Sequence, residues 1–64
     1  MDKLSQLQNY AASKQMKIRL FLDGDIVHVQ KFSYQYRSFM IYSDAGIVSL
    51  AQPDIFAQLD RIAA

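Results

Sequence analysis

The sequence contains no cysteine, no glutamate and only one histidine. Without cysteine no disulfide can form, and a single histidine without thiolate partners does not make a zinc site. A calcium-binding EF-hand loop needs several further oxygen ligands and a closing glutamate, so Asp23-Gly24-Asp25 is interpreted as a turn. The sequence therefore predicts neither a metal site nor a cofactor.

Long apolar runs are also missing. No run approaches the roughly 20 residues that a membrane-crossing helix needs. The first ten residues are polar and lack the apolar segment of a signal peptide. We therefore expect no membrane association and, together with the missing cysteine, a cytoplasmic location.

Catalytic groupings are equally scarce. His28 lies in the middle of a predicted strand, with no cysteine or serine placed to form a relay. The serines lack the glycine-flanked turn of a nucleophile elbow. Asp54 and Asp60 could form a carboxylate pair, but one small domain offers little cleft for it. The sequence predicts a protein that is not an enzyme, has no catalytic residues and takes no small-molecule substrate.

The chain has 64 residues, of which 52% are hydrophobic. We expect a single domain over residues 1–64. A chain of this size buries only about 60% of the surface that its unfolded form exposes. Such domains usually gain stability from disulfides, metals or partner subunits. With the first two excluded, the composition favours a homo-oligomer.

The charge is nearly balanced, with seven Lys and Arg against six acidic residues. A lone duplex-binding domain normally carries a much larger basic excess, because phosphate contacts dominate its affinity. A ring of subunits multiplies a small basic patch, so the near-neutral charge is compatible with binding of single-stranded RNA.

The sequence predicts a helix followed by four short antiparallel strands. Residues 2–15 carry leucine and alanine at helical spacing, and Asp2 is placed to cap the first turn. The predicted strands cover residues 18–22, 26–33, 38–43 and 47–51. Asp23-Gly24 and Asp44-Ala45-Gly46 are interpreted as the turns of this meander. Such a meander favours a small, strongly bent antiparallel barrel.

Residues 53–63 leave two alternatives open. Four apolar residues fall at helical spacing, and Pro53 is suited to the first turn of a helix. The same segment could form a turn and a fifth strand. The periodicity favours the helix.

Aromatic residues crowd the region between the second and third predicted strands: Phe32, Tyr34, Tyr36, Phe39 and Tyr42, with Lys31 and Arg37 among them. Rings that stack on bases and cations that contact phosphates are what single-stranded RNA binding requires. Tyrosine and phenylalanine are also favoured in subunit interfaces. The cluster is therefore interpreted either as an RNA site or as a protein-interaction surface.

Three stretches of the chain read IRLFLDG, YRSFMIYSD and IVSLAQPDI. They resemble the first strand and its turn, the aromatic loop that enters the third strand, and the final segment of the Sm-like family, in particular its bacterial Hfq branch. The resemblance covers about residues 3–59. It implies an SH3-like barrel with an amino-terminal helix, assembled into a homo-oligomeric ring in which the fourth strand pairs with a fifth strand of the neighbouring subunit.

The resemblance also implies an RNA-binding role for particular residues. By position, Tyr36, Arg37, Ser38 and Phe39 line the pore-side uridine site, with Gln52 on the facing loop. Phe21 is similar to the aromatic residue that stacks purines on the opposite ring face. Lys31, together with Arg37, is expected to contact phosphate. The chain departs from the family at its closing Lys-His pair, which is replaced by Ala51-Gln52-Pro53.

Overall fold

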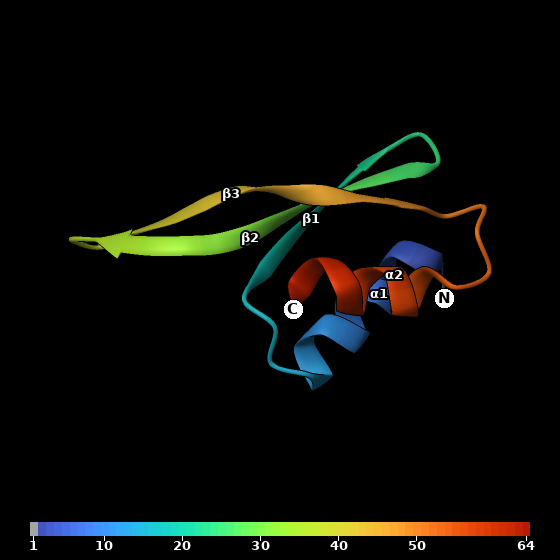
Figure 1. Ribbon diagram of the computed structural model, residues 1–64, viewed down its shortest axis with the longest axis horizontal. Helices are drawn as coiled ribbons and strands as arrows, with labels where there is room; N and C mark the ends of the chain where they lie inside the picture. Colours follow the sequence, from blue (N-terminus) through green and yellow to red (C-terminus); the bar gives the residue numbers. More distant parts are fainter. Residues whose placement is uncertain (1) are drawn as a thin grey trace.

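The computed structural model describes residues 2–64 as an open three-stranded antiparallel sheet with two helices on one of its faces (Figure 1). The elements are α1 (Lys3–Ser13), β1 (Ile18–Asp23), β2 (Ile26–Tyr36), β3 (Phe39–Ser49) and α2 (Ile55–Ala63). The strands follow one another in the order β1-β2-β3. The chain is therefore a small, mainly β domain, and the predicted amino-terminal helix is confirmed.

Both ends of α1 are fixed by local hydrogen bonds. Asp2 Oδ1 accepts a bond from the backbone N–H of Ser5 at 2.7 Å, which satisfies an otherwise free donor of the first turn and lowers the pKa of Asp2. At the other end Gln15 adopts a φ of 57°, and the N–H of Met16 donates to the carbonyl of Ala11 at 2.9 Å. This is the Schellman arrangement that ends many helices.

The predicted third and fourth strands are one strand, so the four-stranded meander is wrong. Val29 pairs with Gly46 and Gln30 with Asp44, which leaves Ala45 without a partner on β2. The extra residue is a β-bulge, which bends a strand without reversing it. The Asp-Ala-Gly sequence predicts a turn because glycine is common in turns, but glycine is also common at β-bulges within a strand.

The carboxyl-terminal segment is the helix α2, as the periodicity predicted. Its buried residues Ile55 and Leu59 face the sheet and α1. No fifth strand exists among residues 2–64, so the element that the Sm-like resemblance assigned to pairing between subunits is absent there. Within one chain the sheet stays open, with β1 and β3 at its edges.

The core lies between the sheet and the two helices and is very small. Among residues 2–64 it consists of seven buried side chains: Leu7, Ala11, Val27, Val29, Val48, Ile55 and Leu59. Helix α2 approaches β3 closely at Gly46, where a Cβ atom would stand 3.3 Å from the side chain of Ile62. The missing side chain therefore lets the helix pack on the bulged strand.

The far halves of β2 and β3, residues 32–42, run past the helices and form what we call the hairpin arm (Figure 1). The molecule is accordingly elongated, with extents of 38 × 22 × 21 Å. Between residues 2 and 64 neither helix is long and apolar enough to cross a membrane.

Tyr10 links the two helices. Its hydroxyl donates to Asp60 Oδ2 at 2.7 Å, and its ring centroid lies 4.9 Å from that of Phe56. The hydrogen bond to Asp60 is the main reason why the pKa of Tyr10 is raised above its ordinary value of 10.0, because it stabilises the protonated hydroxyl.

We predict that this contact makes stability depend on pH in the alkaline range. Since the pKa of Tyr10 is higher in the folded than in the unfolded chain, its stabilisation is complete below about pH 10 and is lost as the pH rises through the folded pKa. Urea unfolding of the wild type and of Tyr10→Phe over this range measures the effect. The stability advantage of the wild type should shrink as the pH rises, and a constant difference would contradict the prediction.

Candidate functional site

The face of the sheet opposite the helices, here called the outer face, displays three cross-strand rows of side chains. Directly paired residues of an antiparallel sheet share a face. His28 must point outward because its neighbours Val27 and Val29 are buried against the helices. The rows are Phe21–His28–Ile47, Arg19–Gln30–Asp44 and Lys17–Phe32–Tyr42.

Two cations of this face rest on aromatic rings. The guanidinium of Arg19 lies 5.0 Å from the ring centroid of Tyr42 and 5.8 Å from that of Phe21. The ammonium of Lys17 lies 5.4 Å from the ring of Phe32, and the Phe32 and Tyr42 rings meet edge to face at 5.7 Å. These distances fall within the range of cation–π attraction. We call these five residues the aromatic–cation platform.

The hairpin tip contains four of the seven predicted site residues. Tyr36 pairs with Phe39, and Arg37 and Ser38 form the two-residue turn between them. The Arg37 guanidinium lies 5.3 Å from the centroid of the Tyr36 ring. Tyr36 and Phe39 are 57% and 69% exposed, so both rings are open to a partner.

The other three predicted residues lie elsewhere. Phe21 belongs to the platform. Lys31 pairs with Ile18 and lies on the helix-side face, where its ammonium donates to the main-chain oxygen of Ala64. Gln52 lies in the turn after β3, at the end of the sheet opposite the hairpin tip (Figure 1). A strand as long as β3 spans about 33 Å, so one chain does not bring Gln52 to the tip.

Sequence reasoning missed Lys17 and Arg19 as site residues. The signal that could have found them is the Asp23-Gly24 hairpin, whose tight turn sets the register of β1 on β2. Counting back from that turn places Arg19 opposite Gln30 and Lys17 beside Phe32. The cations therefore join the aromatic cluster across strands rather than along the chain.

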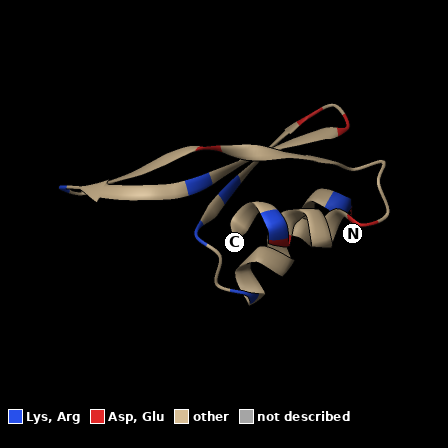
Figure 2. Cartoon of the chain, viewed as in Figure 1, with Lys and Arg blue, Asp and Glu red and all other residues tan. Residues whose placement is uncertain are grey.

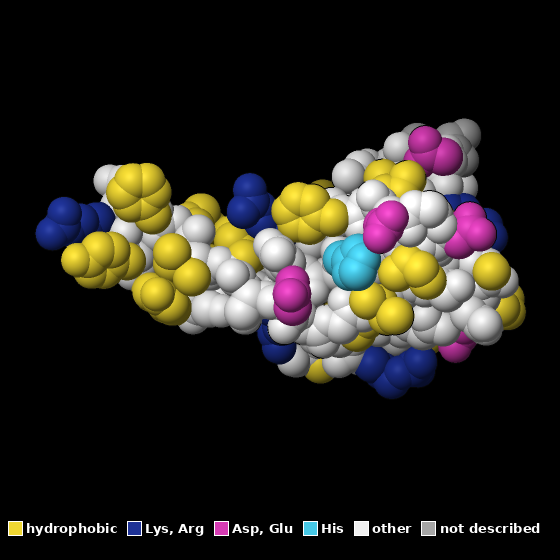
Figure 3. All heavy atoms as spheres, turned by 90° about the horizontal axis from the view of Figure 1, so that it is seen from above, with side chains coloured by type: hydrophobic (Ala, Val, Ile, Leu, Met, Phe, Trp, Pro, Cys, Tyr) yellow, Lys and Arg dark blue, Asp and Glu magenta, His cyan; other side chains and the backbone are white. Residues whose placement is uncertain are grey.

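Charge is distributed unevenly along the sheet (Figure 2). The turn between β1 and β2 is acidic because it carries Asp23 and Asp25. The side nearer the hairpin tip is basic and carries Lys17, Arg19, Lys31 and Arg37. Viewed from above, hydrophobic side chains gather at the end of the arm and again over the sheet, with cations beside them (Figure 3). Arg37 and the aromatic residues of β2 and β3 lie on the arm itself, and Lys17, Arg19 and Lys31 lie at its base.

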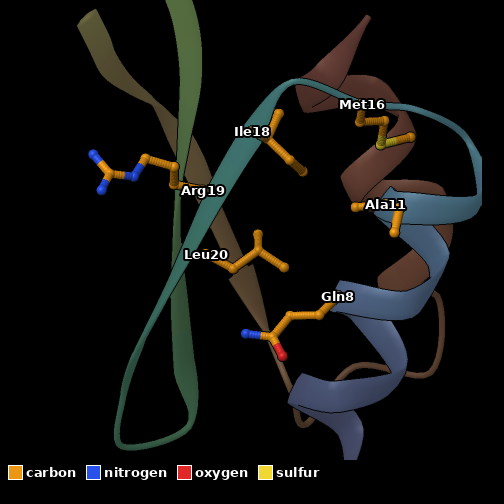
Figure 4. A pocket seen from close by; sticks show the side chains of 7 residues that line it. Gln8, Ala11, Met16, Ile18, Arg19 and Leu20 are labelled. Carbon is orange, nitrogen blue, oxygen red and sulfur yellow. The ribbon is translucent and has the colours of Figure 1, made fainter. Parts of the chain in front are cut away.

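A hollow of about 320 Å³ separates α1 from β1 (Figure 4). It is lined by Gln8, Ala11, Ala12, Met16, Ile18, Arg19 and Leu20. Figure 4 shows Ile18 and Leu20 directed toward the helix, whereas the guanidinium of Arg19 points away from it. The lining holds no acid, base or nucleophile for chemistry. Across the described part of the chain, no three His or Asp side chains gather into a group that could hold a metal.

Comparisons of the chain with protein-family models, curated proteins and solved structures found no match, so no family is assigned to it. Function must therefore be argued from the chemistry of the site rather than from the fold.

The hairpin turn contains a strained residue. Of the two turn residues, Arg37 has a positive φ of 55° and Ser38 does not, as in a type II′ turn. The first central position of that turn type normally holds glycine. Holding a side chain in this left-handed conformation costs about 1–2 kcal/mol. Arg37 keeps this strained position with its guanidinium over an exposed ring.

We predict that Arg37→Gly stabilises the protein. Relief of the strain exceeds the roughly 0.5–1 kcal/mol that glycine costs through the entropy of the unfolded chain, so we expect a net gain of up to about 1 kcal/mol. Denaturant unfolding measures it. Arg37→Ala serves as the control, because it removes the cation and keeps the strain, and it should give no such gain. An equal gain from both variants would show that the strain is not the cause.

Proposed function

We propose that the protein is a non-enzymatic scaffold that binds single-stranded RNA with its aromatic–cation platform and hairpin tip, and that it works as a homo-oligomer. The observation that carries this proposal is the platform itself. Three rings on the open face of the sheet each have a cation within 5.8 Å of their centroid. The helices cover only the opposite face, so Phe21 is exposed and Phe32 and Tyr42 are half-buried.

Each component of the platform has a role in such binding. Aromatic faces stack bases, and this contact tolerates different sequences because every base has a π face. Successive rows on one face of a strand lie about 7 Å apart, and the row of Arg19 separates the ring of Phe21 from the rings of Phe32 and Tyr42. The two ends of the platform therefore lie about 14 Å apart and can each take a base, with Arg19 between them. Lysine and arginine contact phosphates, which supplies the electrostatic part of the affinity. Arg37 on Tyr36 repeats the same pairing at the tip.

Assembly is the second half of the proposal. Seven buried side chains are a thin core, and β1 and β3 each leave one edge unpaired. Exposed edges favour pairing with another chain. A closed barrel and a ring of the Sm-like kind are proposed only for the assembled protein, since a single chain supplies three strands and the remaining ones must come from other copies.

The alternative function is a structural or protein-interaction module whose aromatic cluster is buried between subunits. It is favoured by the apolar surface of the hairpin arm, where Tyr34, Tyr36, Phe39 and Met40 are 56%, 57%, 69% and 49% exposed. Contiguous exposed apolar patches commonly mark protein interfaces.

We predict that Arg19→Gln weakens RNA binding more than Arg61→Gln does. Both changes remove one positive charge, but Arg61 lies on α2, which packs on the opposite face of the sheet. Fluorescence anisotropy with short oligo-U and oligo-A probes across a salt series measures the affinity. Removing a phosphate contact should reduce the salt slope by about 0.7–1. Tyr42→Leu should cost about 1–3 kcal/mol if the ring stacks a base.

The proposal fails if the wild type does not bind either probe at low salt. It also fails if the two arginine variants lose affinity equally, because the platform would then have no special part in binding. Far-UV circular dichroism checks that each variant remains folded.

We predict that Tyr36→Ala separates the two candidate functions. If the tip binds RNA, this variant loses affinity for the probes and keeps the sedimentation behaviour of the wild type. If the tip is a subunit interface, the oligomer dissociates. Gln35→Ala, one position away and pairing with Met40 rather than Phe39, is the matched control and should change neither property.

A further inference from the structure

The free edge of β1 is a ready template for strand pairing. The N–H of Phe32 donates to the carbonyl of Lys17 at 3.0 Å, so the backbone groups of Lys17 face β2. Because these groups alternate in an antiparallel ladder, those of Ile18, Leu20 and Leu22 point to the free edge.

The edge of β1 lacks the backbone features that blunt an exposed edge, although the strand carries the charged side chains of Arg19 and Asp23. Its register on β2 is unbroken from Ile18 to Asp23, without a bulge, and it contains no proline. Proteins usually protect an exposed edge with bulges, prolines or a covering element. The other edge strand, β3, carries the bulge at Ala45 and is packed by α2. The edge of β1 is therefore the more open of the two.

We infer that β1 pairs with β1 of a second copy of this chain, antiparallel and around a two-fold axis at Leu20. The inference rests on the homo-oligomer of the proposed function and names one of its interfaces. Because a two-fold contact closes on itself as a dimer, a ring would need a second interface, for which the free edge of β3 is the other candidate. Directly opposite residues must share a face of the sheet. In this register Ile18 lies opposite Leu22 of the second copy, and Leu20 lies opposite its own equivalent. All the free backbone groups of Ile18, Leu20 and Leu22 are then paired.

The side chains are complementary on both faces in this register. On the outer face Lys17 lies opposite Asp23 of the second copy, and Arg19 lies opposite Phe21. Opposite charges that face each other across a strand pair are favourable, whereas like charges are unfavourable. The side chain of Asp23 is 82% exposed, and its contact with His28 is long, with 3.7 Å between Asp23 Oδ2 and His28 Nε2. Asp23 is therefore available for a new partner.

The helix-side face is complementary as well. Leu22 is 51% exposed in the single chain, although it lies on the same face as the buried Val27. In the dimer it lies opposite Ile18, over the hollow between α1 and β1 that Ile18 and Leu20 line (Figure 4). The β1–β1 contact thus pairs the free backbone groups of β1, buries Leu22 and covers the hollow between α1 and β1.

A neighbouring register is less favourable. Centring the axis on Phe21 places Arg19 opposite Asp23 of the second copy, which also matches charges. It leaves the free backbone groups of Ile18 opposite Gly24, which lies in the turn between β1 and β2. Centring on Arg19 places two guanidinium groups opposite each other. The axis at Leu20 alone satisfies the whole edge.

A charge swap tests both the interface and its register. Lys17→Asp alone places two aspartates opposite each other on each side of the axis, and Asp23→Lys alone places two lysines there. Each variant should be monomeric at micromolar concentration, where the wild type is a dimer. An equimolar mixture of the two should form a heterodimer, because each opposed pair then carries opposite charges. Sedimentation equilibrium and native mass spectrometry measure all four samples.

Several results would overturn the inference. A monomeric wild type refutes the dimer, and a mixture that stays monomeric refutes the pairing. A Lys17→Asp variant that remains dimeric refutes the register, because the axis at Leu20 then places two aspartates opposite each other. These measurements need no RNA, so their failure is distinct from a failure of RNA binding, which the anisotropy titration of the wild type reports.

A second variant tests the edge by its backbone. Leu22→Pro removes an N–H that faces the free edge and takes no part in the ladder with β2, and proline is tolerated at such edge positions. Leu22→Val is the matched control. The proline variant should keep its far-UV circular dichroism and lose the dimer, whereas the valine variant should keep both. A dimer that survives the proline change would overturn the inference.

Discussion

The packing of two short helices against one half of one sheet face is the contact on which the rest of the structure depends. Leu7 and Ala11 of α1 and Ile55 and Leu59 of α2 meet the valines of β2 and β3, and these residues form the buried core of the described part of the chain. The helices are too short to cover strands of 11 residues. The uncovered length of the sheet becomes the hairpin arm, and the uncovered face becomes the platform.

The two bulges allow this core to coexist with long strands. The bulge at Ala45 keeps β3 continuous while Gly46 admits α2 at close range. The second bulge, between Phe32 and Tyr34, separates the platform from the tip. An extra residue also changes which side chains share a face. The aromatic residues of β2 are therefore divided between two surfaces instead of forming one continuous stripe.

Features governed by local chemistry could be predicted from the sequence. Asp2 caps α1 through its own side chain, the Asp23-Gly24 turn needs only neighbouring residues, and the periodicity of α2 reflects its buried face. The sequence also predicts an aromatic connection between the second and third strands, but it places residues 34–37 in a loop, whereas β2 continues to Tyr36.

Features that depend on a partner strand could not be predicted. Whether Gly46 makes a turn or a bulge is decided by the continuation of β2 beside it. Lys31 appears next to aromatic residues in the sequence but lies on the helix side, because each step along a strand reverses the face. Arg19 enters the site only through the register of β1 on β2. Non-local pairing therefore determines most of the site's composition.

The proposed dimer and the proposed RNA platform compete for one residue. In the dimer Lys17 faces a carboxylate of the second copy, which reduces its availability for phosphate. Arg19 is less affected, because it lies opposite a ring there and its guanidinium has five N–H donors. A two-fold axis perpendicular to the sheet brings both outer faces to the same side, with Arg19 and Phe21 of each copy near the centre. The dimer thus uses Lys17 to hold the edges together and leaves Arg19 and Arg37 to contact the nucleic acid.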